Sequence, residues 1–214
     1  MSKRLMLGLL LVLAGAGGLA FYLLGGSAPP PVEATVSDAQ NDTANGQVAN
    51  GQTEDLENML YLDLKDGRVV IKLRPDLAPN HVARIKELAR QGFYDGIVFH
   101  RVIDGFMAQT GDPTGTGAGG SGQKLKAEFS QEPHVRGTVS MARAQSPDSA
   151  DSQFFICFDD ARFLDGQYTV WGEVVEGMEF VDNIKKGSQA NNGSVTGPDA
   201  IVKMQVAADA EGAS

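Results

Sequence analysis

Short runs of alternating apolar and polar residues recur along the last three quarters of this chain. Such runs predict half-buried strands, because successive side chains of a strand point to opposite faces of its sheet. The runs lie at residues 59–64, 68–73, 97–102, 137–142, 153–158, 168–174 and 201–206. Asp66 and Gly67 between the first two runs are typical of a tight hairpin turn, in which both central residues need φ > 0.

Two further segments have helical spacing. The apolar residues of 79–90 recur at intervals of three or four, with Pro79 at the start and Gly92 just past the end, which predicts a helix. A shorter helix is expected at 178–186, and the Gly-rich stretch 111–122 is expected to be a loop. Many short strands with two helices favour an antiparallel barrel or sandwich over alternating βαβ units.

The chain begins with an apolar segment preceded by two cations. Residues 5–24 carry no charge and follow Lys3 and Arg4, and about 20 apolar residues suffice to cross a bilayer as a helix. The alternative is a cleaved signal peptide, because 14–16 has the small-x-small form of a cleavage site. The apolar run continues past that site, which favours an uncleaved anchor. We expect an exported protein, either anchored in the inner membrane facing the periplasm or soluble in the periplasm after cleavage.

The composition changes after this first segment, which we place at 1–24. Residues 25–57 are rich in Pro, Ala, Asn, Gln, Thr and Gly and poor in large apolar residues, so we predict a disordered, flexible linker. Residues 58–208 then form a single folded domain, and 209–214 form a tail.

Charge and cysteine content narrow the class of protein. The 214 residues include 18 Lys+Arg and 27 Asp+Glu, a formal net charge of −9. This charge argues against binding to nucleic acid, which requires a basic face. Cys157 is the only cysteine, so the chain contains no disulfide, and its apolar neighbours favour an inert core thiol over a nucleophile.

The most informative segment is 99–112. The permanently charged Arg101 lies among apolar residues there, with Phe106, Met107 and Gln109 close behind it. A guanidinium next to apolar surface is costly unless its donors are used. The segment therefore predicts a site where one fixed cation faces an apolar pocket.

Other candidate chemistry is weaker. Three glycines of 111–122 have the spacing of a dinucleotide-binding loop, but no helix is expected after them. The histidines show no metal-ligand spacing, so we expect no metal site. A hydrolytic triad of Ser140, His100 and Asp104 lacks a nucleophile elbow around the serine.

What remains is an arginine, a glutamine and several aromatic residues, without an acid, base or nucleophile. Such a set suits a reaction in which no bond is made or broken. Rotation about the peptide bond before proline is a reaction of this kind, since its barrier of about 18–20 kcal/mol comes from amide resonance. Uncatalysed rotation takes tens to hundreds of seconds.

Four blocks of the sequence resemble the cyclophilin family of peptidyl-prolyl cis-trans isomerases. They are FHRVIDGFMAQTGD at 99–112, GTVSMA at 137–142, SQFFI at 152–156 and LDG at 164–166, in family order. The resemblance implies a mainly β fold: a closed eight-stranded antiparallel β-barrel capped by two α-helices. In this chain the barrel would follow the N-terminal hydrophobic helix and the disordered linker.

The resemblance also implies the residues of the site. Those implied to be catalytic are Arg101, Phe106 and Gln109. Those implied to bind the peptide are His100, Met107, Ala142, Arg143, Gln153, Phe155, Phe163, Leu164 and Tyr168. In the twisted transition state the prolyl nitrogen regains a lone pair, so an arginine N–H aimed at it binds the transition state more strongly than the planar substrate. No cofactor is required.

Three positions depart from the best-known eukaryotic members of the family. Phe163 stands where those have tryptophan, Tyr168 where they have histidine, and Arg143 where they have asparagine. Without the indole N–H, we expect weaker binding of cyclosporin. The other two changes bear on substrate preference.

The expected function is isomerisation of X–Pro bonds during protein folding outside the cytoplasm, by a monomer whose partners are proline-containing polypeptides. Two alternatives stay open. One is a binding or chaperone module of the same fold with little turnover, and the other is a hydrolase using Ser140. The intact set of Arg101, Phe106, Gln109 and Phe155 favours the isomerase.

Overall fold

The computed structural model describes residues 55–211, and this part of the chain is mainly β. Its eight strands are β1 (Met59–Leu64), β2 (Gly67–Leu73), β3 (Arg101–Ile103), β4 (Met107–Thr110), β5 (Thr138–Met141), β6 (Phe154–Cys157), β7 (Val170–Glu176) and β8 (Lys203–Val206). It also contains the α-helices α2 (Pro79–Arg90), α3 (Met178–Asp182) and α4 (Ala207–Glu211), and the 3₁₀ turns η1 (Pro147–Ser149), η2 (Arg162–Leu164) and η3 (Gln189–Asn191).

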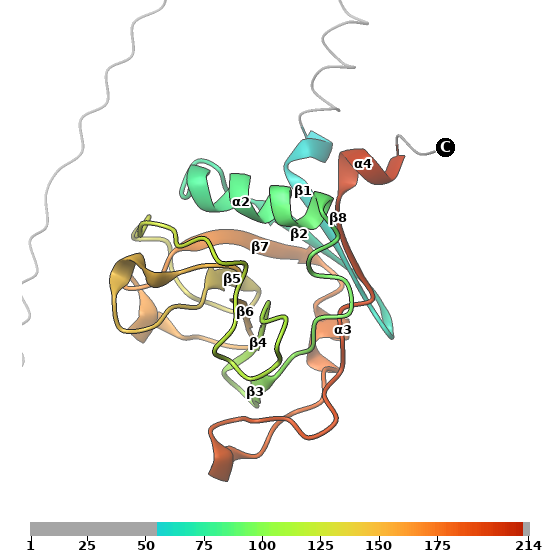
Figure 1. The fold of residues 1–214 in the computed structure, drawn as a ribbon, viewed down its shortest axis with the longest axis vertical. Coiled ribbons are helices and arrows are strands. Elements are labelled where there is room, and N and C mark those ends of the chain that lie inside the picture. Colours follow the sequence, from blue (N-terminus) through green and yellow to red (C-terminus); the bar gives the residue numbers. More distant parts are fainter. Residues whose placement is uncertain (1–54, 212–214) are drawn as a thin grey trace, which may run out of the picture. The chain divides into compact units, whose positions relative to one another are not determined.

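The strands form one antiparallel sheet in the order β3-β4-β6-β5-β7-β2-β1-β8 (Figure 1). The alternation predicted at 59–64 is confirmed, because Leu60 and Leu62 are fully buried while their neighbours in β1 are partly exposed. β5 and β6 are buried at every position. Both faces of the sheet are therefore covered around these two strands.

The hairpin between β1 and β2 has a different turn from the predicted one. Leu64 pairs with Gly67, so the two loop residues are Lys65 and Asp66, and neither has positive φ. The predicted hairpin is confirmed, but the predicted Asp66-Gly67 turn is wrong, because Gly67 already pairs with Leu64 as the first residue of β2. A Cβ atom at Gly67 would overlap the ring of Phe180, and the missing side chain lets α3 pack against β2.

The segments before β3 and β8, the two ends of the strand order, bond to each other. The amide of Phe99 donates to the carbonyl of Asp199 at 2.9 Å, and the amide of Gly96 donates to the carbonyl of Ile201 at 2.8 Å. These contacts bring the C-terminal part of the chain beside the segment that leads into β3.

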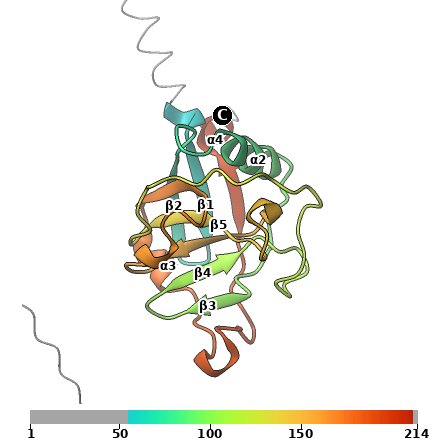
Figure 2. The same ribbon diagram turned by 90° about the vertical axis from the view of Figure 1, so that its left-hand side faces the viewer.

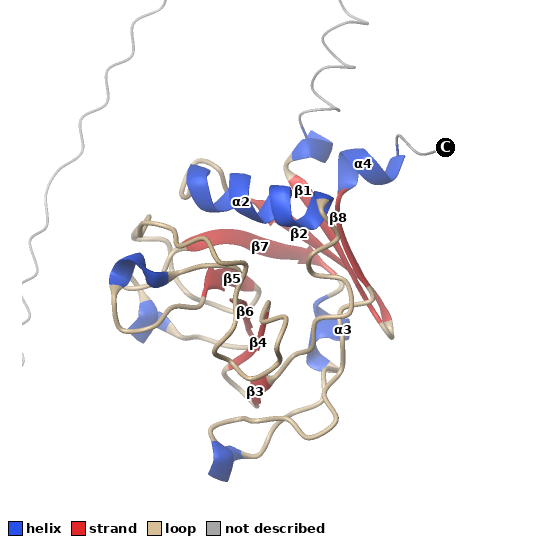
Figure 3. Ribbon diagram, in the orientation of Figure 1, coloured by secondary structure: helices blue, strands red, loops and turns tan. Residues whose placement is uncertain are grey.

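Helix α2 has the bounds predicted from its apolar spacing, and Gly92 beyond its end has a φ of 65°. It packs against β7 and β8 and lies across the sheet in Figures 1 and 3. The first amides of a helix have no partner within it, and Ala78 at the N-cap has no side chain to bond them. Glu128 does so instead, accepting from the amides of Asn80 and His81 at 3.2 and 3.0 Å.

Three elements differ from their predictions. The strand expected at 97–102 begins later, as β3, and β4 was not expected. The helix expected at 178–186 ends four residues earlier, as α3. Figure 3 shows the long loop between β4 and β5, which includes the Gly-rich stretch 111–122 as predicted.

The expected anchor or signal peptide at 1–24 and most of the linker at 25–57 lie outside the described residues. Residues 209–211 of the expected tail form the end of α4. Between residues 55 and 211, no helix combines the length and the apolar composition that crossing a bilayer requires.

Candidate active site

Three neighbouring strands bring the main site residues into one row. Arg101 of β3 lies directly opposite Gln109 of β4, and Gln109 lies opposite Phe155 of β6. Directly opposite residues point to the same face of a sheet, so these three side chains share one face. Met107, two residues before Gln109 in β4, points to this face as well.

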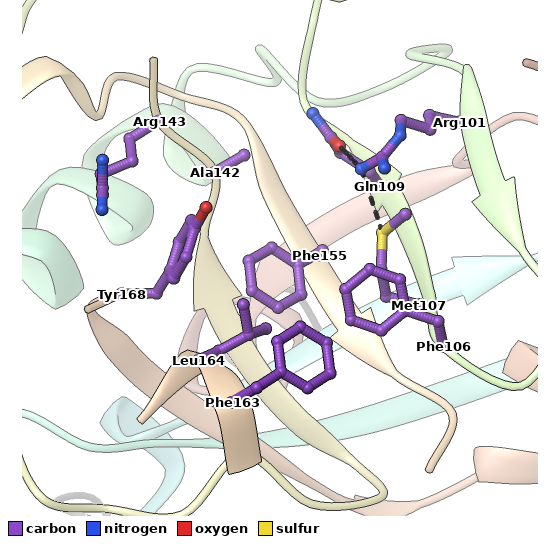
Figure 4. A pocket seen from close by; sticks show the side chains of 10 residues that line it. All are labelled: Arg101, Phe106, Met107, Gln109, Ala142, Arg143, Phe155, Phe163, Leu164 and Tyr168. Carbon is purple, nitrogen blue, oxygen red and sulfur yellow. Dashed lines mark hydrogen bonds between the residues drawn. The ribbon is translucent and has the colours of Figure 1, made fainter. Parts of the chain in front are cut away.

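A pocket of about 260 Å³ opens on this face (Figure 4). Its ten lining residues are Arg101, Phe106, Met107, Gln109, Ala142, Arg143, Phe155, Phe163, Leu164 and Tyr168. All of them belong to the set named from the sequence. In Figure 4 Arg101 and Gln109 lie on one side, Arg143 and Tyr168 lie on the other, and Phe155 lies between them.

The polar side of the pocket is a chain of hydrogen-bonded side chains. Nη1 of Arg101 donates to Oε1 of Gln109 at 3.1 Å, and Nε2 of Gln109 donates to Oε1 of Gln153 at 2.9 Å. Nε2 of Gln153 donates to the carbonyls of Gly117 and Gly119 at 3.0 and 2.8 Å. The chain therefore runs from the cation to the backbone of the Gly-rich loop.

A buried carboxylate shapes that loop. Asp112 has no exposed surface and accepts from the amides of Thr116, Gly117 and Gly119 at 3.0, 2.6 and 3.1 Å. Burial alone would raise the pKa of Asp112, but hydrogen bonds from Thr114 and the loop amides outweigh it and lower the pKa to about 2. Asp112 thus fixes the carbonyls of Gly117 and Gly119, which accept the hydrogen bonds from Gln153.

Neutral acceptors hold the cation itself. Nε of Arg101 donates to the carbonyl oxygen of Asn192 at 3.0 Å, and Nη2 donates to Oδ1 of the same residue at 2.9 Å. Nη1 donates to Gln109 and also to the weak acceptor Sδ of Met107, at 4.0 Å, so four of the five N–H donors of the guanidinium have a partner. Within residues 55–211 no carboxylate pairs with Arg101. Burial lowers the pKa of Arg101, yet arginine stays protonated in proteins.

The apolar side of the pocket rests on a hydrophobic cluster that is separate from the main core. The buried members of this cluster are Met107, Phe155, Cys157, Ala161 and Leu164. The rings of Phe106 and Phe163 lie against each other with centroids 5.4 Å apart. Phe155 is 5% exposed and Phe163 is 66% exposed, so Phe155 forms the floor of the pocket and Phe163 its rim.

A buried histidine lies behind this floor. The ring of His134 stacks on Phe155 with centroids 6.2 Å apart. Its Nδ1 lies 3.1 Å from Oδ1 of Asp165, and its Nε2 lies 3.0 Å from Oγ of Ser140. Burial lowers the pKa of His134, although Asp165 acts in the opposite direction.

This arrangement corrects the hydrolytic triad considered from the sequence. The hydroxyl of Ser140 lies 3.0 Å from Nε2 of His134 and 2.9 Å from the carbonyl oxygen of Thr169, and it has no hydrogen bond to His100 or Asp104 in the described part of the chain. Ser140 and His134 have no exposed surface, so no substrate reaches the hydroxyl. The group supports the pocket from behind and does not act as a nucleophile.

The side chain of Arg143 helps to form the wall of the pocket opposite Arg101. Its guanidinium lies over the ring of Tyr168, 4.7 Å from the centroid, and its Nε donates to the carbonyl of Gln167 at 3.1 Å. Its Nη1 donates to the carbonyls of Ala144 and Gln145 at 2.9 and 3.1 Å. Arg143 therefore joins the loop that follows β5 to the loop that precedes β7.

Two residues of the predicted set do not line this pocket. Gln153 lines an adjoining pocket of about 210 Å³ that shares a wall with the first. His100 lines neither of the two. It is 9% exposed, and its ring nitrogens have no hydrogen-bond partner among residues 55–211. Because adjacent side chains of an extended chain point to opposite faces, the orientation of Arg101 toward the pocket directs His100 away from it.

The thiol of Cys157 lies in the apolar cluster beneath the pocket, with no exposed surface. Burial raises its pKa to about 12, so the thiolate that a nucleophile requires is not formed near neutral pH. Among residues 55–211 no three His, Cys, Asp or Glu side chains are grouped so that they could hold a metal ion.

Sequence reasoning missed Asn192. The Asn192-Gly193 pair is a turn signal that the sequence does carry, and Asn192 has a φ of 53°. Nothing in the sequence shows that this turn faces Arg101, which lies 91 positions earlier. His134 was noted only as a histidine without metal-ligand spacing, and its place behind Phe155 also required the structure.

Known proteins share both the sequence pattern and the fold. Residues 59–206 match the family described as cyclophilin type peptidyl-prolyl cis-trans isomerase. A probable peptidyl-prolyl cis-trans isomerase of Brucella suis is 57% identical over 176 residues, which cover 77% of this chain and 90% of the relative. Peptidyl-prolyl cis-trans isomerase B of Bacillus subtilis is 45% identical over 130 residues, which cover 59% of this chain and 90% of the relative.

Two crystal structures of cyclophilins resemble the described fold. One, from Hirschia baltica, has a TM-score of 0.63 and 30% identity, and the match covers 71% of this chain and 74% of that one. The other, from Cryptosporidium parvum in the presence of the dipeptide Ala-Pro, has a TM-score of 0.64 and 27% identity, covering 69% and 98%. This chain belongs to the cyclophilin family and is a peptidyl-prolyl cis-trans isomerase.

Proposed function

We propose that this isomerase acts on X–Pro bonds in flexible polypeptide segments and that Arg101 is its catalytic group. The observation that carries the proposal is the setting of the guanidinium. It lies beside an apolar pocket and is held by the neutral acceptors Gln109 and Asn192. Its positive charge is therefore fixed in place without being neutralised by an acid.

This setting suits the transition state of proline isomerisation. In the planar substrate the lone pair of the prolyl nitrogen is delocalised into the amide, and in the twisted transition state it becomes a hydrogen-bond acceptor. The N–H donors of Arg101 that Gln109 and Asn192 leave free bond this nitrogen more strongly in the twisted form. Since the donors are aimed before the reaction, no reorganisation is needed. A rate gain of about 10⁵ corresponds to about 7 kcal/mol.

The apolar side of the pocket holds the proline ring. Phe155 supplies the floor, and Met107 and Leu164 extend it. Burial of the ring fixes the prolyl side of the bond while the carbonyl side turns. The Cryptosporidium parvum cyclophilin that was crystallised in the presence of Ala-Pro supports a proline-containing substrate for this chain.

The proposal is tested by measuring proline isomerisation with the full chain and with Arg101→Ala. We expect kcat/KM to fall by about 10³-fold, because a preorganised charge at the reacting centre is removed. Arg68→Ala serves as the matched control, since Arg68 lies on β2 and pairs with Asp63 at the surface. An Arg101→Ala protein as active as the Arg68→Ala control would refute the role of Arg101.

We further propose that the isomerase domain, residues 58–208, works in the periplasm on a tether formed by 25–57, with 1–24 as the membrane anchor. The support is Lys3 and Arg4 followed by an uncharged apolar run. Mass spectrometry of the protein from a membrane fraction decides between the two forms. A mass that includes 1–24 supports the anchor, and a shorter mass with recovery in the soluble fraction supports a cleaved signal peptide.

We also infer that the sheet closes into an eight-stranded barrel. The support is the pair of hydrogen bonds from Phe99 to Asp199 and from Gly96 to Ile201. Amide hydrogen exchange tests this inference, because closure protects the amides of Phe99 and Gly96 as strongly as those within the ladders. Rapid exchange at both amides would contradict it.

A further inference from the structure

We propose that Asn192 is a positioning residue for catalysis, which orients the guanidinium of Arg101 while leaving its charge uncompensated. This inference rests on the proposed catalytic role of Arg101. Asn192 belongs to none of the sequence blocks that identify the active site, and it does not line the pocket. It acts through the arginine and not on the substrate.

One residue supplies two acceptors to the arginine. The backbone carbonyl of Asn192 accepts from Nε, and the side-chain Oδ1 accepts from Nη2. Two bonds on one edge of a planar guanidinium fix both the position and the plane of the group. The opposite edge, which carries Nη1, is thereby turned toward Gln109 and the pocket.

The backbone at Asn192 makes this double contact possible. Asn192 ends the turn η3 with φ 53° and ψ 38°, and it is the only residue other than glycine with positive φ among residues 55–211. Asparagine tolerates this left-handed conformation better than most residues. The conformation lets the carbonyl and the side chain of the same residue reach the arginine together.

The loop that carries Asn192 is pinned to the strand that carries Arg101. The amide of Val102 donates to the carbonyl of Gly193 at 2.8 Å, and the amide of Gly187 donates to the carbonyl of Val102 at 2.9 Å. In Figures 1 and 2 this segment, coloured orange-red, lies next to β3. The distance from Asn192 to the backbone of Arg101 is therefore set by main-chain bonds on the residue next to the arginine.

The chemical nature of the acceptor follows from the reaction. A carboxylate at this position would accept the same two hydrogen bonds, but it would neutralise the cation. A neutralised guanidinium is a weaker donor to the prolyl nitrogen when its lone pair forms. The amide of Asn192 provides the geometry of a carboxylate without its charge.

Two substitutions separate orientation from charge. Asn192→Gly keeps the left-handed backbone and the carbonyl acceptor but removes Oδ1. Asn192→Asp keeps an acceptor of the same shape and adds a negative charge. Asn191→Asp is the matched control, because it adds the same charge one residue away, and Asn191 has no side-chain hydrogen bond to Arg101 in the described chain.

The measurements are kcat and KM for an Ala-Pro peptide, by NMR exchange, with full-length proteins. We expect kcat to fall about tenfold in Asn192→Gly and in Asn192→Asp, with KM within about twofold of wild type in both. The Asn191→Asp control is expected to keep both parameters. The Nε–Hε resonance of Arg101 should broaden in Asn192→Gly, whose Arg101 has lost one anchor, and should stay sharp in Asn192→Asp.

Opposite results would overturn the inference. A wild-type kcat in Asn192→Gly would show that Oδ1 does not position the arginine. A wild-type kcat in Asn192→Asp would show that the neutrality of the acceptor has no role. An Arg101→Ala protein with wild-type activity would instead refute the catalytic role of Arg101 itself, so the two failures are distinguishable.

Discussion

The two sides of the pocket are held in place by different kinds of interaction. On the polar side Arg101, Gln109 and Gln153 are joined by side-chain hydrogen bonds that end on backbone carbonyls. On the apolar side Phe155 is held by packing in a small cluster and by stacking on His134. Long polar side chains lose more conformational entropy on ordering than rings do, so only the polar side needs a chain of bonds to hold one geometry.

The two sides of the pocket therefore contribute differently to the catalytic rate and to the free energy of unfolding. The hydrogen bonds of the polar side are partly exposed, so each contributes little to the free energy of unfolding, but together they aim the donors. The buried rings of the apolar side contribute to unfolding free energy and to substrate binding at once. Substitutions on the polar side should therefore change the rate alone, and substitutions in the apolar floor should change stability as well.

Among substitutions that keep the charge or leave Arg101 in place, the largest effect on rate is expected from Arg101→Lys. A lysine keeps the charge, but its ammonium cannot bond two atoms of Asn192 and the oxygen of Gln109 in one plane. We expect kcat/KM to fall about 100-fold and the unfolding free energy to change by less than about 1 kcal/mol. Isomerase assays and urea denaturation measure the two quantities. A lysine variant with the wild-type rate would show that charge without orientation is sufficient.

Phe155→Ala should affect both quantities. Removing a buried ring leaves a cavity in the cluster, and we expect the unfolding free energy to fall by about 3 kcal/mol. KM should rise because the floor of the pocket is lost. Phe129→Ala is the matched control, since Phe129 is 39% exposed and should cost much less. Equal losses of unfolding free energy in the two variants would show that Phe155 contributes no more to stability than an exposed ring.

The pH dependence of stability should come from the region behind the apolar side. Burial lowers the pKa of His134 from its ordinary value near 6.5, so the folded protein favours the neutral ring. This contribution is complete above about pH 6.5 and is lost as the pH falls through the lower pKa of the folded state.

The experiment compares urea unfolding of the wild type and His134→Gln between pH 7.5 and about pH 5. We expect a shallower loss of stability in the variant. Some slope should remain, because burial also lowers the pKa of His100. Identical slopes for the two proteins would exclude His134 as a source of the pH dependence.

The smallest effect on stability is expected at the rim. Phe163 is 66% exposed, so Phe163→Trp should change the unfolding free energy by less than about 0.5 kcal/mol. The indole adds an N–H donor at the edge of the pocket, and one new hydrogen bond corresponds to about fivefold tighter binding of cyclosporin. Titration calorimetry measures this change, and unchanged or weaker binding would show that the donor does not reach the ligand.

The sequence predicted the elements whose own residues specify them. The apolar spacing of 79–90 specified α2, and the alternation at 59–64 specified β1. It did not predict β4, because all of its positions except Gln109 are buried and no alternation is visible. Nor did it place the first turn correctly, since the reason for Gly67 is the ring of Phe180 about 110 positions away.

The same distinction between local and distant partners applies to the residues of the site. Side chains that face the pocket were found because they lie in the family blocks or within two residues of them. The groups that hold these side chains were not found, because their partners are distant in sequence: Asn192 for Arg101, and His134 for Phe155. His100 was included through its position beside Arg101, and strand alternation turns it away from the pocket.

Position 192 also has a consequence for mutational tolerance. It is exposed and lies in a loop, where most substitutions cost little. Its left-handed backbone restricts the choice mainly to glycine, asparagine and aspartate. Glycine lacks the second acceptor and aspartate carries a charge, so asparagine alone satisfies both requirements. A saturation library selected for isomerase activity should therefore treat this surface position as strictly as a buried one.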